Sequence, residues 1–82
     1  MKIIFSISAF RQLSKLNKDA QKRINDKLSF YVSQNDPLDF AERLTDYQFG
    51  GWRYRVGDYR IIFDVEKEKI FILKIGHRKN IY

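Results

Sequence analysis

Apolar residues in the first half of the chain recur at the spacing of amphipathic helices. Residues 2–8 alternate loosely between apolar and polar and predict a short first strand. Two helical stripes follow, one formed by Phe10, Leu13 and Leu16 and the other by Ala20, Ile24, Leu28 and Tyr31. Asn17 stands between them, where it either ends the first helix or caps the second. These patterns predict a strand followed by an antiparallel pair of helices.

The second half of the chain alternates with the period of two that is typical of strands. After an irregular segment over residues 34–49, strands are predicted over 51–56, 58–66 and 69–76. Helices that come as a group, followed by strands that come as a group, indicate an α+β fold with an antiparallel sheet. We therefore expect the order β-α-α-β-β-β in a single domain over residues 1–82, with two N-terminal helices packed on a twisted antiparallel sheet.

A two-residue turn at Gly57-Asp58 sets the register of the first predicted hairpin. Glycine at the first central position suits a type II′ turn, which needs a positive φ there. This register places Val56 opposite Tyr59, Tyr54 opposite Ile61 and Arg55 opposite Arg60. Two arginines directly opposite each other destabilise a sheet, and a local rule that is broken without an evident compensation tends to mark a functional site. A polyanion is the natural ligand for guanidinium groups gathered in this way.

Strand alternation assigns the two faces of the sheet. The face toward the helices is expected to carry Trp52, Tyr54, Val56, Tyr59, Ile61, Phe63 and Val65. The opposite face is expected to carry Arg53, Arg55, Arg60 and Ile62. The last strand is apolar on both sides, and the register chosen for it places Phe71, Leu73 and Ile75 in the core, with Ile70, Ile72 and Lys74 outward. An outward strip of Ile62, Ile70 and Ile72 would mark a surface for a protein partner.

Composition narrows the class of protein further. Of 82 residues, 44% are hydrophobic, which is enough for one small core. The absence of cysteine excludes a disulfide framework and a cysteine-based metal site, and His77 has no carboxylates at metal-ligand spacing. No apolar run is long enough to span a membrane, so we expect a cytoplasmic protein. The net charge of +6 lies mostly on the predicted sheet and indicates an anionic partner, such as nucleic acid, ribosomal RNA or an acidic protein.

Two segments of the strand-rich half resemble a known family. The order of elements, the segment YRVGDYRIIF over residues 54–63 and the ending IGHRKNIY over residues 75–82 are similar to the RelE/ParE superfamily of type II toxins. The similarity extends over essentially the whole chain and rests most on these two motifs at this separation. It implies the RelE/ParE fold and a small toxin that a cognate acidic antitoxin holds inactive in a toxin–antitoxin hetero-oligomer.

The resemblance implies an activity as well. RelE-like members bind the ribosomal A site and cut the mRNA there, by attack of a ribose 2′-OH on the adjacent phosphorus, without a metal or cofactor. A ribosome-dependent endoribonuclease is therefore the first expectation for function, with the ribosome and mRNA as partners. ParE-like members share the fold and inhibit DNA gyrase without enzymatic activity, and this alternative stays open. A catalytically inert relative that acts as a binding module is the third alternative.

The family motifs also assign roles to individual residues. By resemblance, the catalytic set comprises Arg53, Arg55, Arg60, Arg78 and Tyr82. The arginines are expected to bind phosphate and the charge of the transition state, and Tyr82 to orient or stack on the scissile nucleotide. Three further residues are expected to contact RNA, namely Lys74, His77 and Lys79. Arg53 stands where RelE-like enzymes often carry lysine, and arginine stays protonated, so Lys74 or Lys79 is the candidate base.

Overall fold

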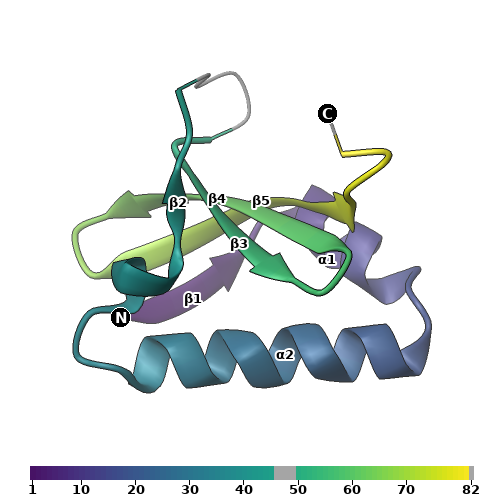
Figure 1. Cartoon of the computed structure of the whole chain (residues 1–82), viewed down its shortest axis with the longest axis horizontal. Helices are drawn as coiled ribbons and strands as arrows, with labels where there is room; N and C mark the ends of the chain where they lie inside the picture. The colour runs from purple at the N-terminus through teal and green to yellow at the C-terminus, as the bar shows by residue number, and fades with distance from the viewer. Residues whose placement is uncertain (46–49, 82) are drawn as a thin grey trace.

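Helices and strands follow one another along the chain largely in the predicted order. The computed structural model describes residues 1–45 and 50–81. Its elements are β1 (Lys2–Phe5), α1 (Ile7–Ser14), α2 (Lys18–Ser33), the 3-10 turn η1 (Pro37–Phe40), β2 (Glu42–Arg43), β3 (Trp52–Val56), β4 (Tyr59–Glu66) and β5 (Lys69–His77). Both helices pack against the sheet, with α2 running across it (Figure 1). The predicted α+β fold, with two N-terminal helices on a twisted sheet, is confirmed.

The strands form one five-stranded sheet in the order β1-β5-β4-β3-β2. The pairs β5–β4, β4–β3 and β3–β2 are antiparallel, as predicted, whereas β1 pairs with β5 in parallel. Parallel neighbours need a long connection, and the helices and the other strands supply it here. The strand β2 was not predicted, because it contains only Glu42 and Arg43 and lies in the segment interpreted as irregular.

Side-chain caps define where both helices begin. The Ser6 hydroxyl accepts a hydrogen bond from the Ala9 N–H at 3.0 Å, and the Asn17 side-chain oxygen accepts one from the Ala20 N–H at 2.8 Å. Each cap satisfies an N–H of the first turn that has no acceptor within the helix. Asn17 is therefore the N-cap of α2, one of the two roles predicted for it.

The variant Asn17→Ala is expected to lower the free energy of unfolding by about 1 kcal/mol, because it removes the acceptor of the Ala20 N–H. Urea denaturation followed by far-UV circular dichroism measures the change. Asn25→Ala is the matched control, since Asn25 is exposed within α2 and alanine favours a helix interior. Equal losses in the two variants would show that the cap adds no specific stability.

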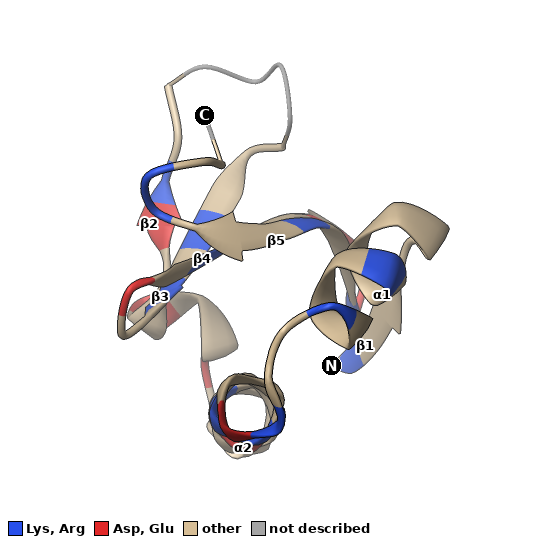
Figure 2. Ribbon diagram, turned by 90° about the vertical axis from the view of Figure 1, so that its right-hand side faces the viewer, with Lys and Arg blue, Asp and Glu red and all other residues tan. Residues whose placement is uncertain are grey.

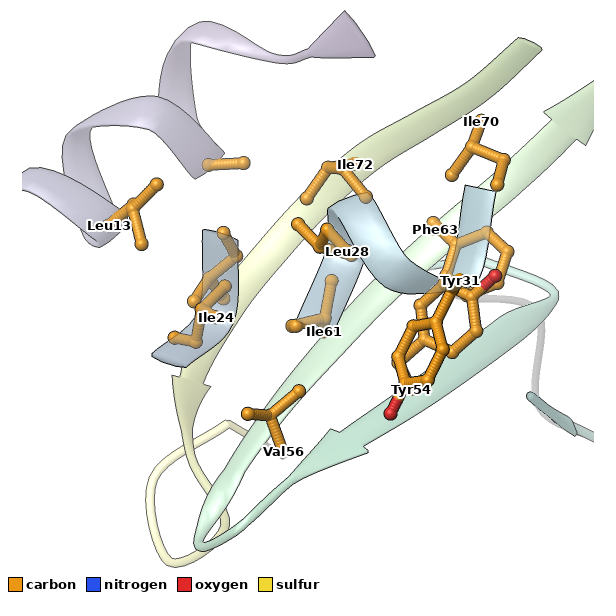
Figure 3. Close-up of a cluster of buried hydrophobic side chains, with 12 residues drawn as sticks. Leu13, Ile24, Leu28, Tyr31, Tyr54, Val56, Ile61, Phe63, Ile70 and Ile72 are labelled. Carbon is orange, nitrogen blue, oxygen red and sulfur yellow. The ribbon is translucent and has the colours of Figure 1, made fainter. Parts of the chain in front are cut away.

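The core lies between α2 and the sheet. The buried stripe of α2 consists of Ala20, Ile24, Leu28 and Tyr31, as predicted. These side chains, Ala20 apart, point toward those of β3 and β4 (Figure 3). The Tyr54 ring stacks between Tyr31 and Phe63, at centroid distances of 4.4 and 4.5 Å. The Tyr54 hydroxyl donates a buried hydrogen bond to the Pro37 carbonyl at 2.8 Å, which ties η1 to the same core.

The apolar stripe of α1 differs from the prediction at one position. Ala9 and Leu13 are buried and Leu16 is partly buried, but Phe10 is 60% exposed. The helix packs mainly on β5, and the small side chain of Ala9 allows it to approach the sheet closely. Because α1 turns Ala9 and Leu13 toward the sheet, Phe10 faces solvent.

The predicted register of β5 is wrong for half of the strand, because a β-bulge interrupts it. Lys74 pairs with Ile62, but the next pair joins Ile72 to Phe63, so Leu73 is the extra residue. The bulge turns Ile70 and Ile72 into the core and leaves Phe71 and Leu73 outside it, while Ile75 is buried as predicted. The expected outward strip of Ile62, Ile70 and Ile72 therefore does not exist.

Candidate functional site

The hairpin of β3 and β4 has the register that the Gly57-Asp58 turn predicts. Gly57 has a φ of +58°, and Val56 pairs with Tyr59. Arg55 lies directly opposite Arg60. Arg53, two residues before Arg55, is on the same face of the sheet as this pair. We call this surface, formed by Arg53, Arg55 and Arg60, the arginine face.

Two rows of paired residues run across the sheet on the arginine face. One row joins Arg53, Ile62 and Lys74, and the other joins Arg55, Arg60 and Gly76. Lys74, one of the three residues predicted to contact RNA, therefore lies on the same face of the sheet as the arginines. Gly76 contributes no side chain, and Ile81 lies over it, since a Cβ built on Gly76 would be 3.6 Å from Ile81. The second row thus places Arg60 next to a position that Ile81 covers.

A carboxylate that the sequence analysis missed partly offsets the like charges. Glu42 of β2 lies opposite Arg53, and its Oε2 accepts a hydrogen bond from Arg53 Nη2 at 2.8 Å. Its other oxygen is 2.6 Å from Arg55 Nε. The hydrogen bond from Arg53 and the charges of the nearby arginines hold the pKa of Glu42 below its ordinary value, against the opposing effect of burial. The expectation that the arginine pair has no compensation is therefore wrong for Arg55.

Glu42→Gln is expected to remove a small, pH-dependent contribution to stability. The folded-state pKa of Glu42 is lowered, so its contribution is complete above the ordinary value of 4.5 and is lost as the pH falls through the folded-state pKa. The Glu42 side chain is 44% exposed, which keeps the difference from wild type below about 1 kcal/mol at pH 7. Urea denaturation at several pH values measures it.

Glu68→Gln is the control for this experiment, since Glu68 is an exposed acid in the turn between β4 and β5. A pH-dependent difference that is seen in Glu42→Gln and not in this control is assigned to the ion pairs of Glu42. A Glu42→Gln difference that stays constant below pH 4.5 would contradict the assigned ion pairs.

Backbone carbonyl groups hold the Arg60 side chain, whereas Arg53 and Arg55 are held by the Glu42 carboxylate. Only 9% of the residue is exposed, and its Nη1 donates hydrogen bonds to the carbonyl oxygens of Gly57 at 2.8 Å and Tyr59 at 2.9 Å. Carbonyl acceptors orient a guanidinium group without cancelling its charge. Arg60 is therefore a fixed cation on the arginine face.

Arg78 joins the site from the C-terminal side. Its backbone N–H donates a hydrogen bond to the Asp58 carbonyl at 2.8 Å, which attaches the chain after β5 to the hairpin turn. The Arg78 Nε is 3.6 Å from Asp58 Oδ1, and both side chains are more than half exposed, so this ion pair is weak. Figure 2 shows the basic segments of β3, β4 and this turn on the same side of the molecule.

The other three predicted site residues are Lys79, His77 and Tyr82. Lys79 is exposed in the turn after β5, and its backbone N–H donates a hydrogen bond to His77 Nδ1 at 3.2 Å. The His77 ring packs edge-on against Tyr59, at a centroid distance of 5.8 Å, and Tyr59 contacts the core. His77 is thus on the opposite face of the sheet from Arg60. Tyr82 lies outside the described residues.

Other kinds of site find little support in the described part of the chain. Among residues 1–45 and 50–81, no three His, Asp or Glu side chains gather into a group that could hold a metal ion. Neither helix in these ranges has the length and hydropathy of a membrane span. The chemistry available at the arginine face is the binding and stabilisation of anionic oxygen.

The chain is similar to known proteins in both sequence and fold. The model of the ParE toxin of the type II toxin–antitoxin system parDE matches residues 3–82. The RelBE2 toxin–antitoxin complex of Mycobacterium tuberculosis contains a chain that is 25% identical, with a TM-score of 0.75 over 94% of this chain and 96% of that one. A chain of the RelB–RelE complex of Methanococcus jannaschii is 26% identical, with a TM-score of 0.68 over 93% and 91% of the two chains.

A more distant structure shares the fold alone. A chain of the intact E. coli RelBE complex is 16% identical, with a TM-score of 0.62 over 93% of this chain and 94% of that one. A search of curated proteins found no match. The family match extends over nearly all residues, including both motifs around the arginine face. The chain therefore belongs to the ParE toxin family, within the RelE/ParE superfamily of type II toxin–antitoxin toxins.

Proposed function

We propose that this toxin is a ribosome-dependent endoribonuclease that cleaves mRNA by attack of a ribose 2′-OH on the adjacent phosphorus. The observation that carries the proposal is the convergence of Arg53, Arg55 and Arg60 on one face of the sheet, with Arg78 attached to the same turn. Cleavage by this route passes through a phosphorane whose oxygens carry extra negative charge. Cations that are already in place stabilise that charge without reorganisation in the transition state.

The arginines have different roles in this mechanism. Arg60 is fixed by two carbonyl oxygens, so it supplies an oriented cation for the phosphorane. Arg53 and Arg55 hold the Glu42 carboxylate in the free protein, and a phosphate would replace that carboxylate on binding. Lys74, on the same face, and Lys79 remain the candidate bases, and Tyr82 is proposed to position the nucleotide.

An acidic antitoxin is the proposed partner that restrains this activity. The most similar solved structures named above are chains of toxin–antitoxin complexes. The chain carries a net charge of +6, so an acidic partner that covers the arginine face would block access of RNA. We propose that the two proteins form a hetero-oligomer in the cytoplasm, where the ribosomes are.

Induction of the toxin followed by mapping of mRNA 5′ ends tests the proposed activity. We expect cuts within codons that occupy the ribosomal A site, only in messages that are being translated. Intact messages under growth arrest would overturn the proposal.

DNA gyrase inhibition is the second candidate, and the pairing of Arg53 and Arg55 with Glu42 favours it, since this pairing reduces the charge available for RNA. A DNA-damage response with intact messages would identify that function. Binding to the antitoxin without either effect would identify an inert binding module.

A further inference from the structure

A groove on the helix side of the sheet lies between α2 and the turn that joins β3 to β4. It has a volume of about 580 Å³. Its lining includes Arg23, Lys27, Phe30 and Tyr31 of α2, together with Arg55 and Gly57 of the hairpin. Of these residues, only Arg55 belongs to the arginine face described above.

Arg23 is placed directly over the hairpin turn. A Cβ built on Gly57 would lie 2.7 Å from Arg23 Nη2, and Gly57 also has a φ of +58°. Glycine at this position therefore both makes the turn and leaves room for the guanidinium group. Lys27 lies one helical turn further along the same face of α2, with its Nζ 6.0 Å from the centre of the Phe30 ring. The two cations thus stand in line along one wall of the groove.

The groove is positively charged and has an aromatic surface. Arg23, Lys27 and Arg55 are exposed cations that line it from two elements, while Asp26 is the one acid in the lining. The Asp26 carboxylate accepts a hydrogen bond from Lys22 at 2.8 Å. Phe30 is 48% exposed beside Lys27. Cations for phosphates and an aromatic ring for base stacking are the features by which proteins bind single-stranded nucleic acid.

Arg55 connects the groove to the arginine face. It lies opposite Arg60 on the outer side of the sheet, where its side chain, 58% exposed, pairs with Glu42, and the residue also lines the groove. Within the described residues, β2 pairs only with Trp52 and Arg53 of β3, so no strand flanks β3 at Arg55. A chain held on the arginine face can therefore pass around Arg55 into the groove.

We propose that this groove binds single-stranded RNA as a continuation of the RNA held on the arginine face. Arg23 and Lys27 bind successive phosphates, and Phe30 stacks on a base. That the bound RNA continues from the arginine face rests on the proposed function, but binding of RNA in the groove does not require that the RNA is cleaved.

An acidic peptide fits the groove less well than RNA does. The charged groups on its walls are donors, apart from Asp26, which is already bonded to Lys22. A phosphodiester backbone presents only acceptors, whereas a peptide also brings N–H groups that need acceptors.

Binding of labelled RNA across a series of salt concentrations tests the proposal. The probe is a 2′-O-methyl RNA of about 12 nucleotides, a length within the usual range of single-strand sites. It cannot be cut by the 2′-OH route, so binding is read separately from catalysis. Each phosphate contact with a single strand contributes roughly 0.7 to the slope of log K against log salt, so Arg23→Gln/Lys27→Gln should reduce that slope by about 1.4.

The matched control is Lys15→Gln/Lys18→Gln, which removes the same charge from exposed positions outside the groove. We expect the slope of this control to equal that of wild type, and Lys27→Gln alone to give half the effect of the double variant. A trinucleotide, which fills only the arginine face, should bind the groove variant and wild type equally.

Equal slopes for the groove variant and its control would overturn the proposal. So would a loss of affinity for a poly-glutamate peptide in the groove variant without a change in the RNA slope, since the groove would then be a protein-binding site. If induced cells show intact mRNA while the RNA slope still depends on Arg23 and Lys27, the endoribonuclease assignment fails and the groove assignment stands.

Discussion

Arg60→Lys is expected to lower the rate of mRNA cleavage in a translating extract about 100-fold, the usual effect of removing one oriented donor from a transition-state site. Lysine keeps the positive charge but lacks the planar fork that the carbonyl oxygens of Gly57 and Tyr59 orient. The cleavage rate at saturating ribosome concentration, measured by primer extension, reports the effect. The variant should remain folded, because the stem of lysine can occupy much of the space of the arginine stem.

Arg11→Lys is the matched control, since Arg11 is an exposed arginine on α1, away from the arginine face. We expect the control to cleave at the wild-type rate. Wild-type cleavage by the double variant Arg60→Lys/Arg78→Ala would remove the arginine face as the proposed catalytic site. Loss of cooperative unfolding in Arg60→Lys would instead assign Arg60 to the structure of the turn.

Phe63→Ala is expected to lower the free energy of unfolding by about 3–5 kcal/mol, which is the usual cost of deleting a buried phenyl ring. Phe63 is fully buried, stacks on Tyr54 at 4.5 Å and lies opposite Ile72, next to the bulge in β5. Small domains are stable by only about 5–15 kcal/mol, so this variant should be close to unfolding at 37 °C. Urea denaturation followed by circular dichroism measures the loss.

Phe10→Ala is the control for that experiment because the ring of Phe10 is 60% exposed. We expect it to change the free energy of unfolding by less than about 1 kcal/mol, as is usual for surface positions. Similar losses in the two variants would mean that Phe10, rather than only Ala9 and Leu13, packs against β5.

Features that depend on neighbouring residues could be predicted from the sequence. The register of β3 and β4 follows from the two-residue turn at Gly57-Asp58, which aligns Arg55 with Arg60 without reference to the rest of the fold. The stripe on α2 is equally local, because its four apolar residues recur at helical spacing and its outer face is polar. Both helices, the strands β1, β3, β4 and β5, and the arginine face were therefore predictable, whereas the two-residue strand β2 was not.

Features that depend on packing between distant segments could not be predicted in the same way. The residues of β5 are apolar on both faces, so alternation did not distinguish Ile70 and Ile72 from Phe71 and Leu73. The bulge opposite Ile62 and Phe63 decided between them. A helix as short as α1 similarly allowed more than one apolar stripe, and contact with β5 selected the one containing Ala9.

By itself, the sequence determined that two arginines face each other across a tight hairpin and that helices cover the other side of the sheet. The tertiary structure decided how that charge is balanced. Glu42 reaches Arg53 and Arg55 only because a two-residue strand pairs with the edge of β3, and Arg23 reaches Gly57 only because α2 packs beneath the hairpin. Turn chemistry and periodicity act between near neighbours, whereas ion pairs and grooves depend on distances that exist only once the chain has folded.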